Sequence, residues 1–289
     1  MSSKKVWFIT GSSTGFGREL AEELLEQRFR VVATARKPES LNELTEKYPE
    51  TLRAVKLDVT NREEVRAAIA GAISEFGRID VLVNNAGYGS IGALEEFEDE
   101  QIRRQFETNF FGPIDIIRAA LPALREQKSG HIINFSSVGG FVSFPSAGLY
   151  CASKFALEAM TEALSGELVG HGIKATIIEP GAFRTEFNGS ALDIAKNEQP
   201  GLYPTTQQFA GWLRENDGKQ PGDPRKAVKA IIQMVESENP PLRLLLGADA
   251  YAAIEEKLES VRQDIEPWRE VGIKTAFEGV KIGRVGGEK

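Results

Sequence analysis

The chain has 289 residues, of which 41% are hydrophobic and 27% are charged, and these proportions exclude a disordered or fibrous protein. Its 35 basic and 42 acidic residues leave a net charge of -7, which argues against a surface that binds nucleic-acid phosphates. A single cysteine excludes an internal disulfide framework, and with only two histidines it leaves no Cys/His zinc site, so we expect a metal-free cytoplasmic protein.

Six apolar runs predict buried parallel strands, because they are short, unalternating and rich in β-branched residues. The runs are Val6–Ile9, Phe29–Ala33, Ala54–Leu57, Val81–Val83, Ile132–Phe135 and Ala175–Ile178. Between them, apolar residues recur at helical spacing, for example at Leu20, Leu24 and Leu25. This alternation predicts an α/β fold: a Rossmann-type, doubly wound parallel sheet of about seven strands with helices on both faces.

We expect a single domain over residues 1–289. After residue 185 the alternation stops, and residues 186–223, rich in Gly, Pro, Asn and Gln but also in aromatic residues, predict a lid over a substrate site. Residues 224–271 predict a helix, a strand at Leu242–Leu246 and a second helix, which together form one more αβ unit that closes the sheet, and residues 272–289 form a Gly-rich tail. No apolar run is suited to a membrane span or signal peptide, so no membrane partner is expected.

A glycine-rich segment follows the first predicted strand and precedes a helix. Its members are Gly11, Ser12, Ser13, Thr14, Gly15, Phe16 and Gly17. Glycines permit a tight turn and a close approach of the backbone to a ligand, and the free N–H groups at the start of the helix suit a pyrophosphate. In this position the segment predicts dinucleotide binding.

Arg36 follows the second predicted strand, where many dinucleotide-binding folds carry an acidic residue that binds the ribose 2′-hydroxyl. No carboxylate occurs here before Glu39. An arginine would instead pair with a 2′-phosphate, so the sequence favours NADP(H) over NAD(H). The alternative is a solvated Arg36 with NAD(H) as the cofactor.

Ser137, Tyr150 and Lys154 form the strongest catalytic pattern in the chain. Tyr150 and Lys154 are four residues apart in a predicted helix, so they lie on one face of it. An ammonium beside a phenol favours the phenolate and lowers the tyrosine pKa toward the range of general acid/base catalysis. Ser137 follows the fifth predicted strand, so it can meet Tyr150 at the carboxyl edge of the sheet.

With these patterns the chain resembles the short-chain dehydrogenase/reductase family over essentially its first 190 residues. The other motifs that carry the resemblance are Asp58, Asn84–Gly87, Asn109, and Pro180–Gly181 with Thr185. Within the family, the segments Phe110–Pro113 and Leu242–Trp268 are similar to the subgroup of 17β-hydroxysteroid and retinol dehydrogenases.

The resemblance implies a role for each matching residue. Tyr150 would exchange a proton with the substrate oxygen, Ser137 would polarise the carbonyl, and Lys154 would hold the nicotinamide ribose and lower the tyrosine pKa. Asn109 would join a water-linked proton relay to Lys154. The remaining cofactor contacts would come from Asp58 and Val59 at the adenine, from Asn85, Ala86 and Gly87 along the cofactor, and from Pro180, Gly181 and Thr185 at the carboxamide. A homodimer or homotetramer, assembled through the Asn109 and Tyr150 helices, is also implied.

Seven aromatic residues follow the catalytic strands or lie in the lid, and they predict an apolar substrate pocket. They are Phe141, Phe144, Phe183, Phe187, Tyr203, Phe209 and Trp212. We expect Phe144 and Phe187, with Ser137 and Tyr150, to contact a ketone, aldehyde or secondary alcohol. The predicted reaction is the NADP(H)-dependent interconversion of a carbonyl and an alcohol. The alternatives are an NAD-dependent alcohol or hydroxysteroid-type dehydrogenase, and a non-catalytic NADP(H)-sensing protein.

Overall fold

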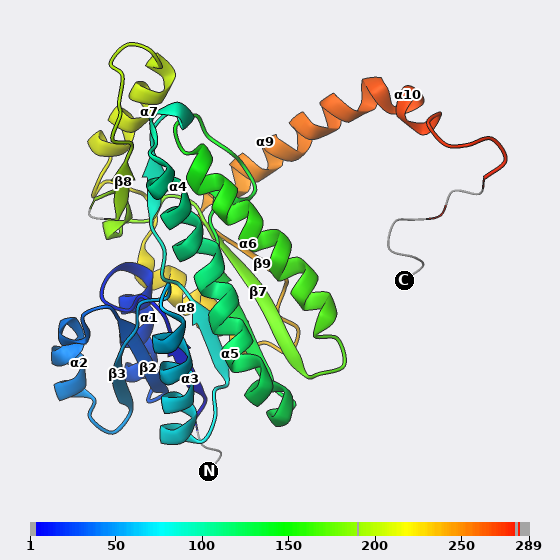
Figure 1. The fold of residues 1–289 in the computed structure, drawn as a ribbon. Coiled ribbons are helices and arrows are strands. Elements are labelled where there is room, and N and C mark those ends of the chain that lie inside the picture. The colour runs from blue at the N-terminus through cyan, green and yellow to red at the C-terminus, as the bar shows by residue number, and fades with distance from the viewer. Residues whose placement is uncertain (1–3, 190, 281–282, 284–289) are drawn as a thin grey trace.

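A parallel sheet of seven strands forms the centre of the protein (Figure 1). The structure is a computed structural model that describes residues 4–189, 191–280 and 283. In chain order, the strands of the sheet are β1 (Val6–Ile9), β2 (Arg30–Ala35), β3 (Leu52–Lys56), β4 (Val81–Asn84), β6 (Gly130–Phe135), β7 (Ile173–Pro180) and β9 (Arg243–Leu246). They lie in the order β3-β2-β1-β4-β6-β7-β9, which confirms the Rossmann-type α/β fold. The order changes direction between β1 and β4, and ligands of such folds bind beyond that point.

The strands form where the apolar runs predict them, with small differences at the ends. All four residues of β1 are buried, as in a strand that is covered on both faces. β2 begins at Arg30, because Phe29 precedes the strand and packs its ring edge-on against Trp7, with 6.2 Å between the ring centres. β3 begins at Leu52, ahead of the predicted run.

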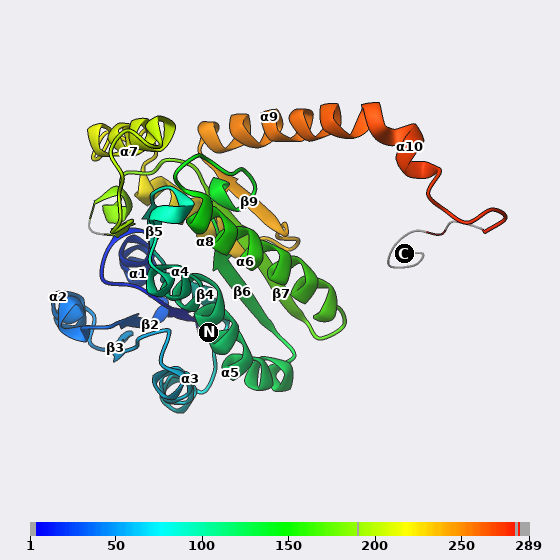
Figure 2. The same ribbon diagram turned by 45° about the horizontal axis from the view of Figure 1, so that its top comes forward.

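Helices cover both faces of the sheet, as predicted (Figures 1 and 2). On one face, α1 (Gly15–Glu26), α2 (Asn42–Lys47) and α8 (Pro224–Glu236) share a hydrophobic core with Trp7 and Ile9 of β1. On the other face, α3 (Arg62–Phe76), α5 (Gly112–Gln127) and α6 (Gly148–Glu167) share a second core with Phe8. Successive residues of a strand point to opposite faces, so β1 contributes to both cores.

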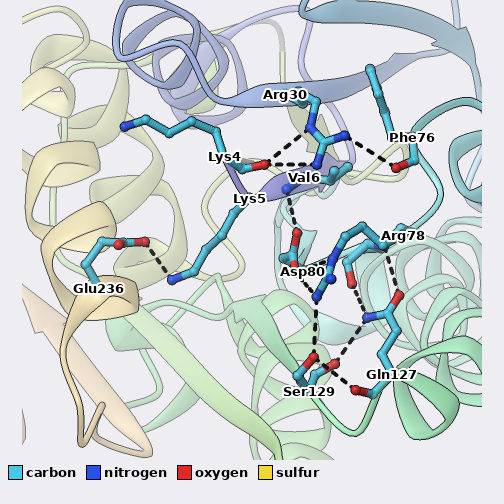
Figure 3. A network of polar contacts seen from close by, with 11 residues as sticks. Lys4, Lys5, Val6, Arg30, Phe76, Arg78, Asp80, Gln127, Ser129 and Glu236 are labelled. Carbon is cyan, nitrogen blue, oxygen red and sulfur yellow. Dashed lines mark hydrogen bonds and ion pairs between the residues drawn. The ribbon is translucent and has the colours of Figure 1, made fainter. Parts of the chain in front are cut away.

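Polar contacts fasten the amino edge of the sheet, opposite the carboxyl ends of the strands (Figure 3). The Arg30 guanidinium donates to the Lys4 carbonyl oxygen at 3.0 Å. Asp80 accepts from the Val6 backbone N–H at 2.8 Å and forms an ion pair with Arg78 at 2.6 Å. These polar groups at the amino edge have their hydrogen-bond and ion-pair partners within the protein. We therefore expect a ligand site at the carboxyl edge instead.

The segment predicted to be a lid packs beside that carboxyl edge. Within it, β8 (Leu192–Ile194) pairs with β5 (Gly89–Ile91) in a separate two-stranded parallel sheet. α7 (Pro204–Glu215) follows, and α4 (Asp99–Phe106) supports β8 through an Arg104–Asp193 ion pair of 2.7 Å. The small sheet therefore fastens the segment to the body of the protein.

β9 forms one edge of the sheet, and the helix that follows it does not cover the sheet. α9 (Ala248–Ile265) leaves the body and carries η6 (Glu266–Trp268) and α10 (Arg269–Ile273) outward (Figures 1 and 2). Within α9, only Ala250 and Ile254 are buried. Of the predicted tail, residues 281–282 and 284–289 lie outside the described residues. In the part of the chain that the structure describes, no helix combines the length and the apolar character needed to cross a membrane.

Candidate active site

The glycine-rich segment forms the turn between β1 and α1 at the carboxyl edge. Gly11 and Gly15 have φ values of +68° and +57°, which residues with a side chain rarely adopt. A side chain at Gly17 would place its Cβ 2.5 Å from Asn85 Nδ2, so only glycine fits there. No acidic residue lies in the first turn of α1, and the Thr14 side chain does not cap the helix. The N–H groups at this end therefore remain available to a pyrophosphate.

Asn85, directly after β4, holds this turn in place. Its Nδ2 donates to the carbonyl oxygens of Thr10 and Gly11 at 2.9 and 3.0 Å. The backbone N–H groups of Asn85 and Ala86 both donate to Thr10 Oγ1, at 2.9 and 3.0 Å. The two predicted cofactor segments are therefore joined. Thr10 is a supporting residue to which the sequence analysis assigned no role, although its place at the end of the first strand was the available signal.

Arg36, the residue predicted to meet a 2′-phosphate, and the two serines of the glycine-rich segment differ in exposure. Arg36 is exposed directly after β2, and within the described residues it has no ion pair or side-chain hydrogen bond. Ser13 is exposed too. Ser12 is buried, and its hydroxyl donates to the Ile9 carbonyl oxygen at 3.1 Å, so it faces into the turn. Arg36 and Ser13 can thus reach a phosphate, whereas the Ser12 side chain stabilises the turn.

The predicted adenine contacts lie after β3. Asp58 Oδ1 accepts from the backbone N–H and the hydroxyl of Thr60 at 2.9 and 2.7 Å. Val59 is buried against the start of α5, where a Cβ at Gly112 would lie 3.0 Å from Val59 Cγ2. One Asp58 oxygen therefore orders the loop, and Val59 supplies an apolar surface beside it.

The predicted carboxamide contacts lie after β7. Pro180 ends that strand, and the Gly181 backbone N–H donates to the Leu246 carbonyl oxygen at 2.9 Å. Thr185 reaches the glycine-rich turn, because its Cβ lies 3.6 Å from where a Cβ of Gly15 would be. The chain after β7 thus borders the same crevice as the turn after β1.

The four predicted catalytic residues come together from separate elements. Tyr150 and Lys154 lie on α6, both buried. Ser137 precedes η4 (Val138–Gly140), where its Oγ accepts from the Gly139 backbone N–H at 3.0 Å. Asn109 lies in η3 (Glu107–Phe111), a π-helical turn between α4 and α5.

Asn109 is fixed by three hydrogen bonds. Its Nδ2 donates to the Tyr88 carbonyl oxygen at 2.9 Å and to Ser153 Oγ at 3.2 Å, while its Oδ1 accepts from the Tyr88 backbone N–H at 3.2 Å. A Cβ at Gly87 would lie 3.1 Å from Asn109 Oδ1 and 3.5 Å from Lys154 Nζ. Glycine therefore keeps open a gap that Asn109 and Lys154 both border.

The electrostatics of the Tyr150 and Lys154 pair differ from the prediction. Burial raises the pKa of Tyr150 above its ordinary value of 10.0, and a hydrogen bond with Ser137 opposes this rise. Burial lowers the pKa of Lys154 to about 8. The Lys154 ammonium donates to the Phe135 carbonyl oxygen at 2.7 Å and lies 5.9 Å from the centre of the Tyr150 ring. Burial of the phenol thus outweighs the hydrogen bond with Ser137, and the predicted effect of Lys154 on the Tyr150 pKa stays a prediction.

A buried charge cluster, formed by Glu158, Glu179 and Arg243, lies beneath the catalytic residues. Arg243 bonds to Glu158 and, at 2.6 Å, to Glu179. Ser136, the neighbour of the catalytic serine, donates to Glu158 Oε1 at 2.6 Å. No sequence pattern predicts this cluster, since its members come from three elements and no motif joins them.

Of the seven predicted aromatic residues, three pack in one apolar cluster with Tyr150 and a fourth, Trp212, extends it. The Phe187 and Tyr150 ring centres are 5.4 Å apart. Phe144 stacks on Phe209 of α7 at 6.0 Å, and Trp212 continues the stack at 6.0 Å. The other three are directed elsewhere: Phe141 packs on Arg243, Phe183 on Phe16, and Tyr203 donates to Glu95. The predicted substrate residues Phe144 and Phe187 thus do lie beside Tyr150.

These residues fit a nicotinamide dinucleotide. The turn after β1 has no room for a side chain at Gly11 or Gly17, the first turn of α1 is free of carboxylates, and Gly87 keeps the backbone open beside Lys154. Within the described ranges, no group of three or more His, Cys, Asp or Glu side chains could hold a metal ion.

Comparison with known proteins gives the same family throughout. The family model described as short chain dehydrogenase matches residues 5–194. The chain is 38% identical to oxidoreductase BOA17 of Botryotinia fuckeliana, over 94% of this chain and 99% of that protein. A solved short-chain dehydrogenase from Streptomyces avermitilis superimposes with a TM-score of 0.88 at 41% identity, over 94% of this chain and 100% of that one.

Other relatives have named substrates or bound cofactors. The chain is 39% identical to 3-ketodihydrosphingosine reductase of Bacteroides thetaiotaomicron (84% of this chain, 88% of that one) and 37% identical to human retinol dehydrogenase 8 (81% and 79%). A solved short chain dehydrogenase from Burkholderia cenocepacia holds NADP, with a TM-score of 0.70 at 29% identity (92% and 97%). One from Burkholderia phymatum holds NAD, with a TM-score of 0.78 at 23% identity (97% and 99%).

Proposed function

The chain belongs to the short-chain dehydrogenase family, and from this membership we propose that it is an NADP(H)-dependent oxidoreductase that interconverts a carbonyl and an alcohol on an apolar substrate. The observation that carries the proposal is the convergence of Ser137, Tyr150, Lys154 and Asn109 beside the glycine-rich turn. NADPH, when bound, supplies the hydride that reduces the carbonyl carbon.

The side chains of the site supply the proton and stabilise the charge. Tyr150 keeps its proton at neutral pH because burial raises its pKa, so it can act as the general acid toward the substrate oxygen. The Ser137 hydroxyl donates to the oxygen as negative charge develops on it. Lys154 holds the nicotinamide ribose, and Asn109, fixed by its three hydrogen bonds, begins the path that returns a proton to Tyr150. For alcohol oxidation the same groups act in reverse.

Preference for NADP(H) is proposed from Arg36. Its exposed guanidinium, free of partners within the described residues, follows β2 where a 2′-phosphate would lie. Ser13 offers a second exposed donor. The relative that holds NADP supports this assignment.

An apolar, extended substrate is proposed from the lid. Phe144, Phe187 and Phe209 pack around Tyr150, so the carbonyl of a substrate would lie beside apolar rings. The names of two relatives, a 3-ketodihydrosphingosine reductase and a retinol dehydrogenase, support long apolar ketones, aldehydes or alcohols as the class to test.

Buried, unpaired Cys151 supports a reducing compartment, and we propose the cytoplasm.

Turnover by a Tyr150→Phe variant tests the proposed function. NADPH oxidation is followed with a panel of long-chain ketones and aldehydes, and the variant is expected to lose about 100-fold or more in turnover while its NADPH affinity is kept. Tyr48→Phe, at the end of α2, serves as the matched control and should be unaffected. Equal turnover by wild type and Tyr150→Phe would contradict the assignment. NADPH binding without turnover of any panel member by the wild type would favour a sensing protein.

A further inference from the structure

The segment from Tyr251 to Trp268, here called the arm, extends away from the body (Figures 1 and 2) and exposes large apolar side chains. The exposed fraction is 54% for Leu258, 55% for Ile265 and 70% for Trp268. Neighbouring exposed groups of this size mark an interaction surface in a folded protein. The arm is helical over most of its length, so its surface is a defined one.

The apolar residues of the arm recur with the spacing of a helix that packs along another helix. They are Tyr251, Ile254, Leu258, Val261, Ile265 and Trp268, separated by three and four residues in strict alternation. Only Ile254, at the root, is buried by the chain itself. This spacing of 3.5 residues gives a narrow seam along one side of a helix, as in a coiled coil, rather than the wide stripe of a helix that covers a sheet.

We propose that the arm is a dimerisation element, and that its seam packs antiparallel against the arm of a second copy of this chain. One alignment satisfies the whole seam, because it sets Leu258 against the partner's Val261, Ile254 against the partner's Ile265, and Tyr251 against the partner's Trp268. Each contact then occurs twice, as a two-fold axis requires.

The charged residues that flank the seam favour this arrangement. In the same alignment, Glu255 faces the partner's Arg262 and Lys257 faces the partner's Asp264, which gives four opposite-charge pairs by symmetry. Within the described residues, Arg262 forms an ion pair only with Glu259 of its own helix, at 3.6 Å, and its side chain is 79% exposed. In a parallel pair, Lys257 would instead face the partner's Arg262, and the like charges would repel.

The composition of the arm also argues for a protein surface over a membrane. The arm carries five acidic residues (Glu255, Glu256, Glu259, Asp264 and Glu266) and two basic ones (Lys257 and Arg262). Helices that bind anionic lipid surfaces are rich in lysine and arginine on their polar face. The arm is also separate from α6 and η3, the Tyr150 and Asn109 elements through which the family resemblance implies assembly.

Light scattering on the purified full-length chain tests the proposal over about 1–100 µM. The wild type is expected to associate, and Leu258→Glu to reduce the assembly by one step, from dimer to monomer or from tetramer to dimer. Leu94→Glu, which changes a still more exposed leucine outside the arm, should leave the assembly unchanged. Circular dichroism and NADPH binding report whether the variants keep the fold. A monomeric wild type, or an assembly that Leu258→Glu leaves intact, would overturn the proposal.

Reversal of Arg262 tests the antiparallel orientation. Arg262→Glu would face Glu255 of the other copy, so dimer affinity should fall by about tenfold, and Glu255→Arg in the same chain should restore it. In a parallel pair, Arg262→Glu would face Lys257 and tighten the dimer. Tighter association of this variant would therefore contradict the proposed arrangement.

Discussion

Replacement of Glu179 by glutamine tests the charge cluster beneath the catalytic residues. Glu179 is fully buried at the end of β7, where Arg243 donates to its Oε1 at 2.6 Å. Burial, and then the Glu158 carboxylate, raise the pKa of Glu179 to about 7, while Arg243 opposes the rise. Within the described residues, its Oε2 has no hydrogen-bond partner. Glutamine keeps the shape of the protonated side chain and cannot ionise.

In the native protein the Glu179 carboxyl therefore keeps its proton up to about pH 7, whereas in the unfolded chain it ionises at its ordinary pKa of 4.5. Stability from this group is fully present below that pH and is lost as the pH rises through about 7. At about 1.4 kcal/mol per pH unit, the loss in the wild type is about 3 kcal/mol. Glu179→Gln cannot ionise and so avoids this loss of stability. Its free energy of unfolding should therefore equal that of the wild type near pH 4.5 and exceed it by about 2–3 kcal/mol above pH 7.

Urea unfolding at pH 5, 6, 7 and 8 provides the measurement, with Glu162→Gln as the matched control. Glu162 also contacts Arg243, at 3.0 Å, but its side chain is 62% exposed, so its replacement should change stability by less than about 1 kcal/mol at every pH. A Glu179→Gln variant that loses stability relative to the wild type as the pH rises would refute the reasoning, because Glu179 would then be ionised and paired.

Three further variants test the cofactor and substrate sites. Gly17→Ala should weaken NADPH binding by about tenfold or more and destabilise the protein by about 1–3 kcal/mol, because the added Cβ enters occupied space. In the control Gly71→Ala the added Cβ meets nothing, so NADPH binding should be unchanged. Lys154→Met should lower both NADPH affinity and turnover, and unchanged kinetics would contradict the assignment. Because burial lowers the Lys154 pKa to about 8, the wild type gains stability as the pH rises from about 8 to 10.5, so the stability of the variant relative to the wild type should fall over this range. Phe187→Ala should raise KM for apolar substrates by about tenfold, and Phe183→Ala, which follows β7 and packs on Phe16 of α1, should not. Equal effects would argue against a substrate contact of Phe187.

The sheet and the position of the site were predictable because one physical rule covers both. Buried parallel strands need continuous apolar runs, and their carboxyl ends share one edge. Ser137 follows β6 and Asn85 follows β4, so the topology alone brings them near the turn after β1. The family pattern then added Asn109, whose π-helical turn leaves no periodic signal of its own.

Other features depend on contacts that no short segment encodes. β5 and β8 have three residues each and are about 100 positions apart, too short for a period of two to be recognised. The Arg243 cluster joins β9, α6 and β7, and its charged residues are individually typical of a surface. The outward direction of α9 depends on tertiary contacts that the sequence pattern does not encode, although its apolar seam is narrower than the stripe of a helix that covers a sheet.

Titration of the wild type and of Arg36→Asp with NADPH and with NADH, followed by nicotinamide fluorescence, tests the assignment of NADP(H) as the cofactor. The wild type is expected to bind NADPH about tenfold or more tightly than NADH, and Arg36→Asp to abolish this preference while NADH binding is kept. Equal affinities in the wild type, or a preference for NADH, would mean that Arg36 is a solvated residue and would contradict the assignment of NADP(H).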